Sequence, residues 1–176
     1  MFATTLTTER LLLRPPTIDD APAIFERYAA DPLVTRYLSW ETHRTIDDTH
    51  AFLDGDHPLD ANWSICLEGD PTPCGMVGAF DRGHKAIIGY VLSRDVWGRG
   101  VATEAAKAVV DEIWKHDRVY RVQADYHVDN LASARVLEKC GLVREAKLRR
   151  WMVMPQIGDE PQDCYLHAQV RDDLGR

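Results

Sequence analysis

The chain has 176 residues, of which 45% are hydrophobic and 28% charged, and its formal net charge is −7. This length suits one domain, residues 1–176, whose core needs no disulfide or metal to hold it together. The excess acid argues against a nucleic-acid or anionic-membrane binder, which would need a basic surface, whereas it would attract a positively charged substrate or simply keep the protein soluble.

The first third of the chain predicts one strand followed by helices. Residues 9–14 form the strand, which two prolines end. A helix begins at residues 17–20, because apolar residues follow at helical spacing, and Asp31-Pro32 ends it. We expect a second helical stretch at 35–38 and another helix beginning at 45–48.

The middle of the chain changes to strands. Residues 62–67 and 74–81 are short apolar-rich runs separated by a turn containing glycine and proline, which predicts neighbouring antiparallel strands. Residues 85–93 form a further strand. Because its apolar residues are nearly continuous, we expect this strand to be buried on both faces.

The last part alternates helices and strands. Residues 100–116 form an amphipathic helix whose apolar stripe contains Val101, Ala105, Val109 and Ile113. The predicted elements that follow are a strand at 118–126, a short helix capped by Asn130 and ended by Gly141, and strands within 142–151 and 163–170. The order predicts a mixed α+β domain of about seven strands.

Cysteine spacing and hydropathy address the environment of the protein. The four cysteines include no C-x-x-C pair, so we expect reduced, buried thiols and no metal site. No secretory signal or membrane-spanning apolar run is present in the sequence, and we expect a cytoplasmic protein.

The segment from Trp97 to Ala102, Trp-Gly-Arg-Gly-Val-Ala, predicts an anion site at the start of the long helix. Its two glycines let the backbone approach a ligand, and a helix start presents unpaired N–H groups with a partial positive charge. These features suit a phosphate or pyrophosphate, to which Arg99 and Arg94 could add charge-assisted contacts. An ordinary tight turn before a helix is the alternative.

Two nucleotide-binding motifs are alternatives for this segment. A P-loop is excluded because no Gly-Lys-Ser/Thr is present. A dinucleotide fingerprint is closer, with Gly98, Gly100 and Thr103 at its spacing and Asp125 ending the next strand. The missing third glycine and the scarcity of further parallel strands argue against it. A dinucleotide-linked oxidoreductase remains the alternative enzyme.

The same segment resembles the acetyl-CoA loop of the GCN5-related N-acetyltransferases (GNAT), Gln/Arg-x-x-Gly-x-Gly/Ala, with Trp97 at the first position. Further similar blocks follow the RimJ/RimL-type ribosomal-protein N-acetyltransferase branch, and the resemblance spans about residues 8–171. They are Thr8–Arg14, Asn130–Ser133 with Val136–Leu142, and Gly158 with Asp163 and Tyr165. The resemblance implies one GNAT-like domain, a mostly antiparallel sheet flanked by about four helices.

The resemblance also implies direct transfer of an acetyl group from acetyl-CoA, the co-substrate, to a primary amine in a ternary complex, without a metal. Main-chain groups of the strand before the loop would hold the pantetheine arm, and backbone amides of the loop the pyrophosphate. Ser133 would act as the acid near the sulfur. The implied acetyl-CoA-binding residues are Tyr90, Val91, Leu92, Trp97, Gly98, Arg99, Gly100, Val101, Ala102, Thr103, Asn130 and Ser133.

The general base is the least defined part of this prediction. Family members often carry a carboxylate just before the Gly-Tyr of this strand, but here Ile87 and Ile88 occupy those positions. Asp125 and His127 are substitutes, acting directly or through water. A CoA-binding module that has lost catalysis is the alternative from another class.

A weak base favours a weak amine as acceptor. At pH 7 an α-amine is about one-seventh neutral, whereas a lysine is roughly one part in 2,500 neutral. We therefore expect a protein N-terminus or a small-molecule amine, bound by residues 31–60 and 150–163. Trp40, Trp63 and Trp151 could line that site, although core packing is the expectation for each. The oligomeric state, a homodimer included, stays open.

Overall fold

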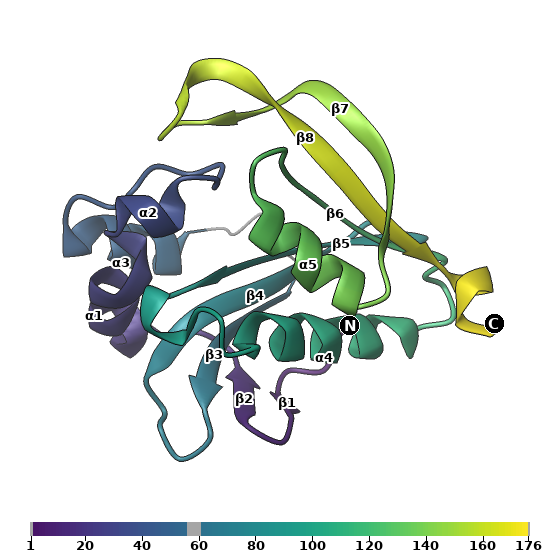
Figure 1. Ribbon diagram of the computed structural model, residues 1–176. Helices are drawn as coiled ribbons and strands as arrows, with labels where there is room; N and C mark the ends of the chain where they lie inside the picture. Colours follow the sequence, from purple (N-terminus) through teal and green to yellow (C-terminus); the bar gives the residue numbers. More distant parts are fainter. Residues whose placement is uncertain (1, 56–60, 176) are drawn as a thin grey trace.

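An eight-stranded sheet runs through the computed structural model, which describes residues 2–55 and 61–175 (Figure 1). The strand order is β1-β2-β3-β4-β5-β6-β8-β7, and every neighbouring pair is antiparallel except β5 with β6. The strands are β1 Leu6–Thr7, β2 Leu11–Arg14, β3 Ala61–Leu67, β4 Pro73–Asp81, β5 Lys85–Leu92, β6 Arg121–His127, β7 Val143–Met154 and β8 Gly158–Val170. The helices are α1 Ala21–Ile24, α2 Pro32–Thr35, α3 Ile46–Asp54, α4 Val101–Trp114 and α5 Leu131–Lys139.

The predicted mixed α+β class is confirmed, with eight strands and five α-helices in the described part instead of about seven and four. The extra strand, β1, is only two residues long. The last two strands are longer than predicted and form a hairpin that arches over the rest of the molecule (Figure 1). None of the described helices has an apolar stretch long enough to cross a membrane.

Helix α4 packs its predicted stripe against the sheet. Val101, Ala105, Val109 and Ile113 are at most 2% exposed and belong to the main core cluster. Burial of each valine or isoleucine side chain contributes roughly 1.5–3 kcal/mol to the stability of the fold. This packing fixes the position of the α4 N-terminus relative to β5, which precedes it in the chain.

The N-terminal helical region departs from the prediction. The expected single helix is a 3₁₀ turn at 18–20, then α1, then a π-helical turn at 25–29. The stretch predicted at 35–38 is wrong, because α2 begins earlier, at Pro32. Proline suits the first helical position, and the Asp31 carboxylate caps the helix by accepting from the Leu33 N–H at 2.9 Å.

Strand β5 is not buried on both faces, contrary to the prediction: Ala86, Ile88 and Leu92 are buried, whereas the residues between them on the other face are partly or fully exposed. Its edges also differ. It pairs with β4 along its length, but with β6 only from Lys85 to Ile87, opposite Arg121–Gln123. Beyond this point β5 and β6 separate. One edge of residues 88–92 therefore faces a gap in the sheet instead of a neighbouring strand.

Both faces of the sheet carry apolar clusters. The larger cluster lies under α4 and α5, and a smaller one joins Ile24, Tyr28 and Ala29 to Met76 of β4. Trp63 is 1% exposed, as expected of a core residue. The four cysteines are buried free thiols.

Candidate active site

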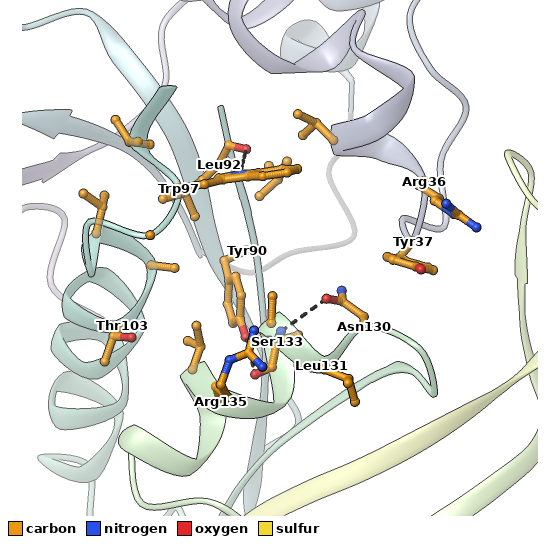
Figure 2. Close-up of a pocket in the computed structure, with 18 of the residues that line it drawn as sticks. Arg36, Tyr37, Tyr90, Leu92, Trp97, Thr103, Asn130, Leu131, Ser133 and Arg135 are labelled. Atoms are coloured by element: carbon orange, nitrogen blue, oxygen red, sulfur yellow. Dashed lines mark hydrogen bonds between the residues drawn. The ribbon is translucent and has the colours of Figure 1, made fainter. Parts of the chain in front are cut away.

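A cleft of about 700 Å³ lies where β5 and β6 separate, between the first turn of α4, the N-terminal half of α5 and the α2 region (Figure 2). It brings together segments that lie up to about a hundred residues apart in sequence. The predicted cofactor-binding residues that line it are Tyr90, Val91, Leu92, Trp97, Gly98, Gly100, Val101, Ala102, Thr103, Asn130 and Ser133.

The two predicted arginines contribute less than expected. Arg99 is exposed and does not line the cleft; its carbonyl oxygen accepts from Arg10 Nη1 at 3.2 Å. Arg94 Nε lies 2.5 Å from Asp31 Oδ2 and so joins the α4 loop to the α2 region. Arg99, which stands between the two glycines, therefore does not bring its positive charge into the cleft.

The glycines shape the wall of the cleft at the start of α4. Gly98 and Gly100 have φ angles of +72° and +80°, in the left-handed region that side chains with a Cβ rarely adopt. Gly100 is the N-cap of α4, and no side chain caps this end of the helix. The first N–H groups of the helix therefore stay free for an anion.

Trp97 has a structural role that the sequence did not indicate. Its indole Nε1–H donates to the Leu92 carbonyl at 2.9 Å and holds the loop against the end of β5 (Figure 2). The Leu92 carbonyl, predicted to bind the pantetheine arm, thus already accepts one hydrogen bond. One lone pair of this carbonyl oxygen remains for a ligand.

Ser133 lies where the cleft is narrowed by α5 and β5. Asn130 caps α5 as predicted, its Oδ1 accepting from the Ser133 N–H at 3.2 Å. The Tyr90 hydroxyl is 2.7 Å from Ser133 Oγ and 3.2 Å from the Ser133 carbonyl oxygen (Figure 2). Burial raises the pKa of Tyr90 well above its ordinary value, so the phenol stays protonated and can donate.

Three cations line the cleft without a carboxylate partner. Within the described residues, Arg36, Arg135 and Lys139 form no ion pair, and Arg135 and Lys139 are one turn apart on α5. Most other arginines and lysines of the described chain are paired with acids, as Arg10 is with Glu104. Unpaired cations at a cleft are expected where an anionic ligand completes the pairing.

Asp125 and His127 lie on one face of β6 because side chains two apart along a strand share a face. Neither residue lines the cleft. His127 stacks on Tyr37, which does, with ring centroids 4.9 Å apart. Asp125 is partly buried, and burial raises the pKa of its carboxyl group, opposed by the hydrogen bond from Trp151 Nε1 at 3.2 Å.

The hydrogen bonds of His127 restrict its chemistry. Its Nδ1 accepts from the Asp129 main-chain N–H at 3.1 Å, which leaves the proton of the neutral ring on Nε2. The lone pair of the neutral ring is therefore already engaged by a main-chain donor. Asp125 carries no such restriction, since within the described residues it has no ion pair and one oxygen receives the indole N–H.

Several site residues were missed from the sequence. The i, i+4 spacing of Arg135 and Lys139 after the Asn130 cap could have placed both on one helix face. The Tyr90 hydroxyl and Arg36 had no local signal, because each reaches the cleft only through tertiary structure. The described residues contain no cluster of three or more histidines, cysteines or acids that could hold a metal ion.

The topology decides between the two enzyme classes. Among the described strands, β5 with β6 is the single parallel pair, whereas a dinucleotide-binding sheet needs several. The oxidoreductase alternative is therefore not supported by the fold.

Comparison with known proteins identifies the family. A family model described as an acetyltransferase (GNAT) domain matches residues 10–143. The uncharacterized N-acetyltransferase YoaA of Bacillus subtilis is 32% identical over 94% of this chain and 96% of its own length. A GNAT-family acetyltransferase from Bacillus anthracis superposes with a TM-score of 0.84 at 28% identity, covering 96% of this chain and 99% of that one.

A more distant structure has the same fold with coenzyme A bound. It is RimL, a ribosomal L7/L12 alpha-N-protein acetyltransferase, with a TM-score of 0.80 at 17% identity, covering 95% of this chain and 97% of its own. The uncapped α4 N-terminus, the cleft between separated strands and the sequence match agree, and the chain belongs to the GNAT family of acetyl-CoA-dependent N-acetyltransferases.

Proposed function

We propose that residues 1–176 form one N-acetyltransferase domain in which the described cleft binds acetyl-CoA. The free N–H groups at the start of α4 would hold the pyrophosphate, and Arg36, Arg135 and Lys139 would pair with the remaining phosphate charge. The edge of β5 that lacks a strand partner would bind the pantetheine arm. These groups fit an extended, anionic ligand, and when bound it supplies the thioester whose acetyl group is transferred.

Ser133 is proposed to stabilise the leaving thiolate. If Tyr90 donates to Ser133 Oγ, the serine O–H is left to donate into the cleft, and hydrogen bonds in such a chain strengthen one another. Because the pKa of a thiol is not far above neutral pH, its thiolate is a good leaving group and needs little further stabilisation. Tyr90 is thus a positioning residue for Ser133, and its phenol stays neutral throughout.

Asp125 is proposed as the general base, acting directly or through one water. His127 is less suitable because its Nδ1 lone pair already accepts a main-chain hydrogen bond. The raised pKa of Asp125 brings the carboxylate closer to the range in which it can take a proton at neutral pH. His127 then serves to hold Tyr37 at the edge of the cleft.

The acceptor is proposed to be an α-amine, of a protein N-terminus or of a small molecule. The observation that carries this is the Asp125 carboxylate, a base that accepts a hydrogen bond from Trp151 and has no ion pair within the described chain. A weak base suits an amine that is already partly neutral at pH 7, as an α-amine is and a lysine is not. The name of the structurally similar RimL, an alpha-N-protein acetyltransferase, supports the same class.

An acceptor screen tests this proposal. Release of free thiol from acetyl-CoA would be measured with peptides that differ only in whether the free amine is the α-amine or a lysine side chain. We expect turnover with the α-amine set and its loss in Asp125→Asn. A preference for lysine would refute the acceptor class, and acetyl-CoA binding without turnover on any amine would favour a binding module instead.

A further inference from the structure

Strand β7 contains a bulge next to the proposed base. Its register against β8 runs from Leu148 opposite Cys164 to Met152 opposite Gln162, so residues 149–151 face a single β8 residue. Within the bulge, Arg150 has φ +50°, the one positive value among the described residues other than glycine. Backbone strain of this kind persists only where surrounding contacts enforce it, and it is concentrated at functional sites.

Asp163 of β8 enforces this conformation. Its Oδ1 accepts from the Arg150 main-chain N–H at 2.9 Å, and its Oδ2 lies 2.9 Å from Lys147 Nζ. Arg150 Nη1 adds an ion pair with Glu160 Oε2 at 2.6 Å. Two neighbouring carboxylates therefore hold one strained residue from both its backbone and its side chain.

The bulge places Trp151 in an unusual setting. Its indole is 54% exposed, which contradicts the expectation that it packs in the core, yet Nε1–H donates to Asp125 Oδ2 at 3.2 Å. A large apolar ring held in solvent by a strained turn gains little from burial. Within the described residues, its hydrogen bond is to the carboxylate proposed as the base.

Within the described residues, Trp151 is the one side chain that donates a hydrogen bond to the Asp125 carboxylate. On β8, the Cys164 thiol is neutral because burial raises its pKa to about 11. On β6 itself, His127 is engaged with Asp129 and stacked on Tyr37. Within the described residues no arginine or lysine pairs with Asp125, so the Trp151 indole N–H is the side-chain donor that favours its charged form, beside the main-chain amide of Asp125 itself.

We propose that Trp151, aimed by the strained Arg150 bulge, is the positioning residue for Asp125, holding the carboxylate oriented and ionised for the acceptor amine. This inference rests on the proposed function, in which Asp125 is the base. Trp151 takes no part in the proton transfer; its indole N–H stays on the nitrogen and fixes one carboxylate oxygen, which leaves the other oxygen to accept the proton.

The first test needs no acceptor. The titration of the Asp125 carboxyl carbon is followed by ¹³C NMR in the full chain, with Asp125→Asn used for assignment. Because the indole favours the charged carboxylate, W151F should raise the pKa of Asp125 by about one pH unit. An unchanged pKa would overturn the inference, and an unchanged melting temperature shows that the exposed ring is not holding the fold.

A matched pair of substitutions isolates the backbone strain. R150G and R150V both remove the ion pair with Glu160, but glycine accepts φ +50° and β-branched valine does not. We expect R150G to keep the wild-type pKa of Asp125 and R150V to raise it as W151F does. Equal values in the two variants would refute the role of the bulge.

Activity distinguishes failure of this inference from failure of the proposed function. With a mixture of short peptides bearing free α-amines as probe, W151F should move the acid limb of the pH–rate profile of thiol release to higher pH, whereas D125N should lose turnover across the whole profile. Loss of turnover in D125N together with a wild-type pH profile in W151F would overturn the inference alone. Wild-type turnover in D125N would overturn the base assignment and the inference with it.

Discussion

The contact between Tyr90 and Ser133 leads to a quantitative prediction. Tyr90→Phe removes a hydroxyl that lies 2.7 Å from Ser133 Oγ and 3.2 Å from its carbonyl oxygen, while the buried ring remains. A hydrogen bond in this setting contributes about 1 kcal/mol to the free energy of unfolding, and Ser133→Ala should cost a similar amount. Because both substitutions remove the same bond, the double variant should lose about 1 kcal/mol less than the sum of the two.

Activity provides the second half of this test. If Tyr90 orients the Ser133 hydroxyl towards the thiolate, each single substitution should lower turnover roughly tenfold while the Kd for acetyl-CoA stays within about twofold. Urea unfolding and thiol release measure the two effects separately. Tyr120→Phe is the control, since Tyr120 is 60% exposed and the described structure shows no hydrogen bond from its hydroxyl. Additive unfolding energies, or unchanged turnover in Ser133→Ala, would refute the reasoning.

Three further predictions concern the cleft and the fold. Gly100→Ala forces a Cβ into φ +80° and should weaken acetyl-CoA binding and lower stability by about 1 kcal/mol, measured by calorimetry and urea unfolding. Removing both Arg135 and Lys139 charges should raise the Kd for acetyl-CoA roughly tenfold and flatten its salt dependence, whereas an unchanged salt dependence would show that neither pairs with phosphate. The Arg118 guanidinium lowers the pKa of Asp81 to about 2, so its stabilising effect is present above about pH 4 and lost as the pH falls through 2. Arg118→Gln should lower stability at pH 7 and weaken this acid-unfolding step without abolishing it, because the Gly83 N–H also favours the carboxylate.

The elements predicted well are those whose signals are local. The apolar stripe of α4 lies within one segment of the chain. The Asn130 side chain accepts a hydrogen bond from an N–H only three residues further along. The glycines at 98 and 100 also carry their own conformational requirement. These features depend on neighbours in sequence, so they can be inferred before the tertiary structure is known.

The features that were missed depend on distant residues. Tyr90 is 43 residues from Ser133, and Trp151 is 26 residues from the carboxylate that its indole contacts. Nothing in the local sequence shows that β5 loses its β6 neighbour after Ile87, which leaves one backbone edge of the strand unpaired. The choice between Asp125 and His127 has a different cause, because the hydrogen bond at His127 Nδ1 comes from Asp129, two residues along the chain, and depends on the conformation of the turn after β6.

The net charge of −7 can now be read against the distribution of charge within the site. The residues that line the cleft include the cations Arg36, Arg135 and Lys139 and one carboxylate, Asp129, so the cleft is locally positive in an acidic protein. An anionic co-substrate is therefore attracted to the cleft, while an ammonium acceptor is repelled by these cations. Asp125 lies on β6 outside this lining and has no cation against it in the described structure. The cations that line the cleft therefore favour an acceptor amine that approaches from the Asp125 side, away from them.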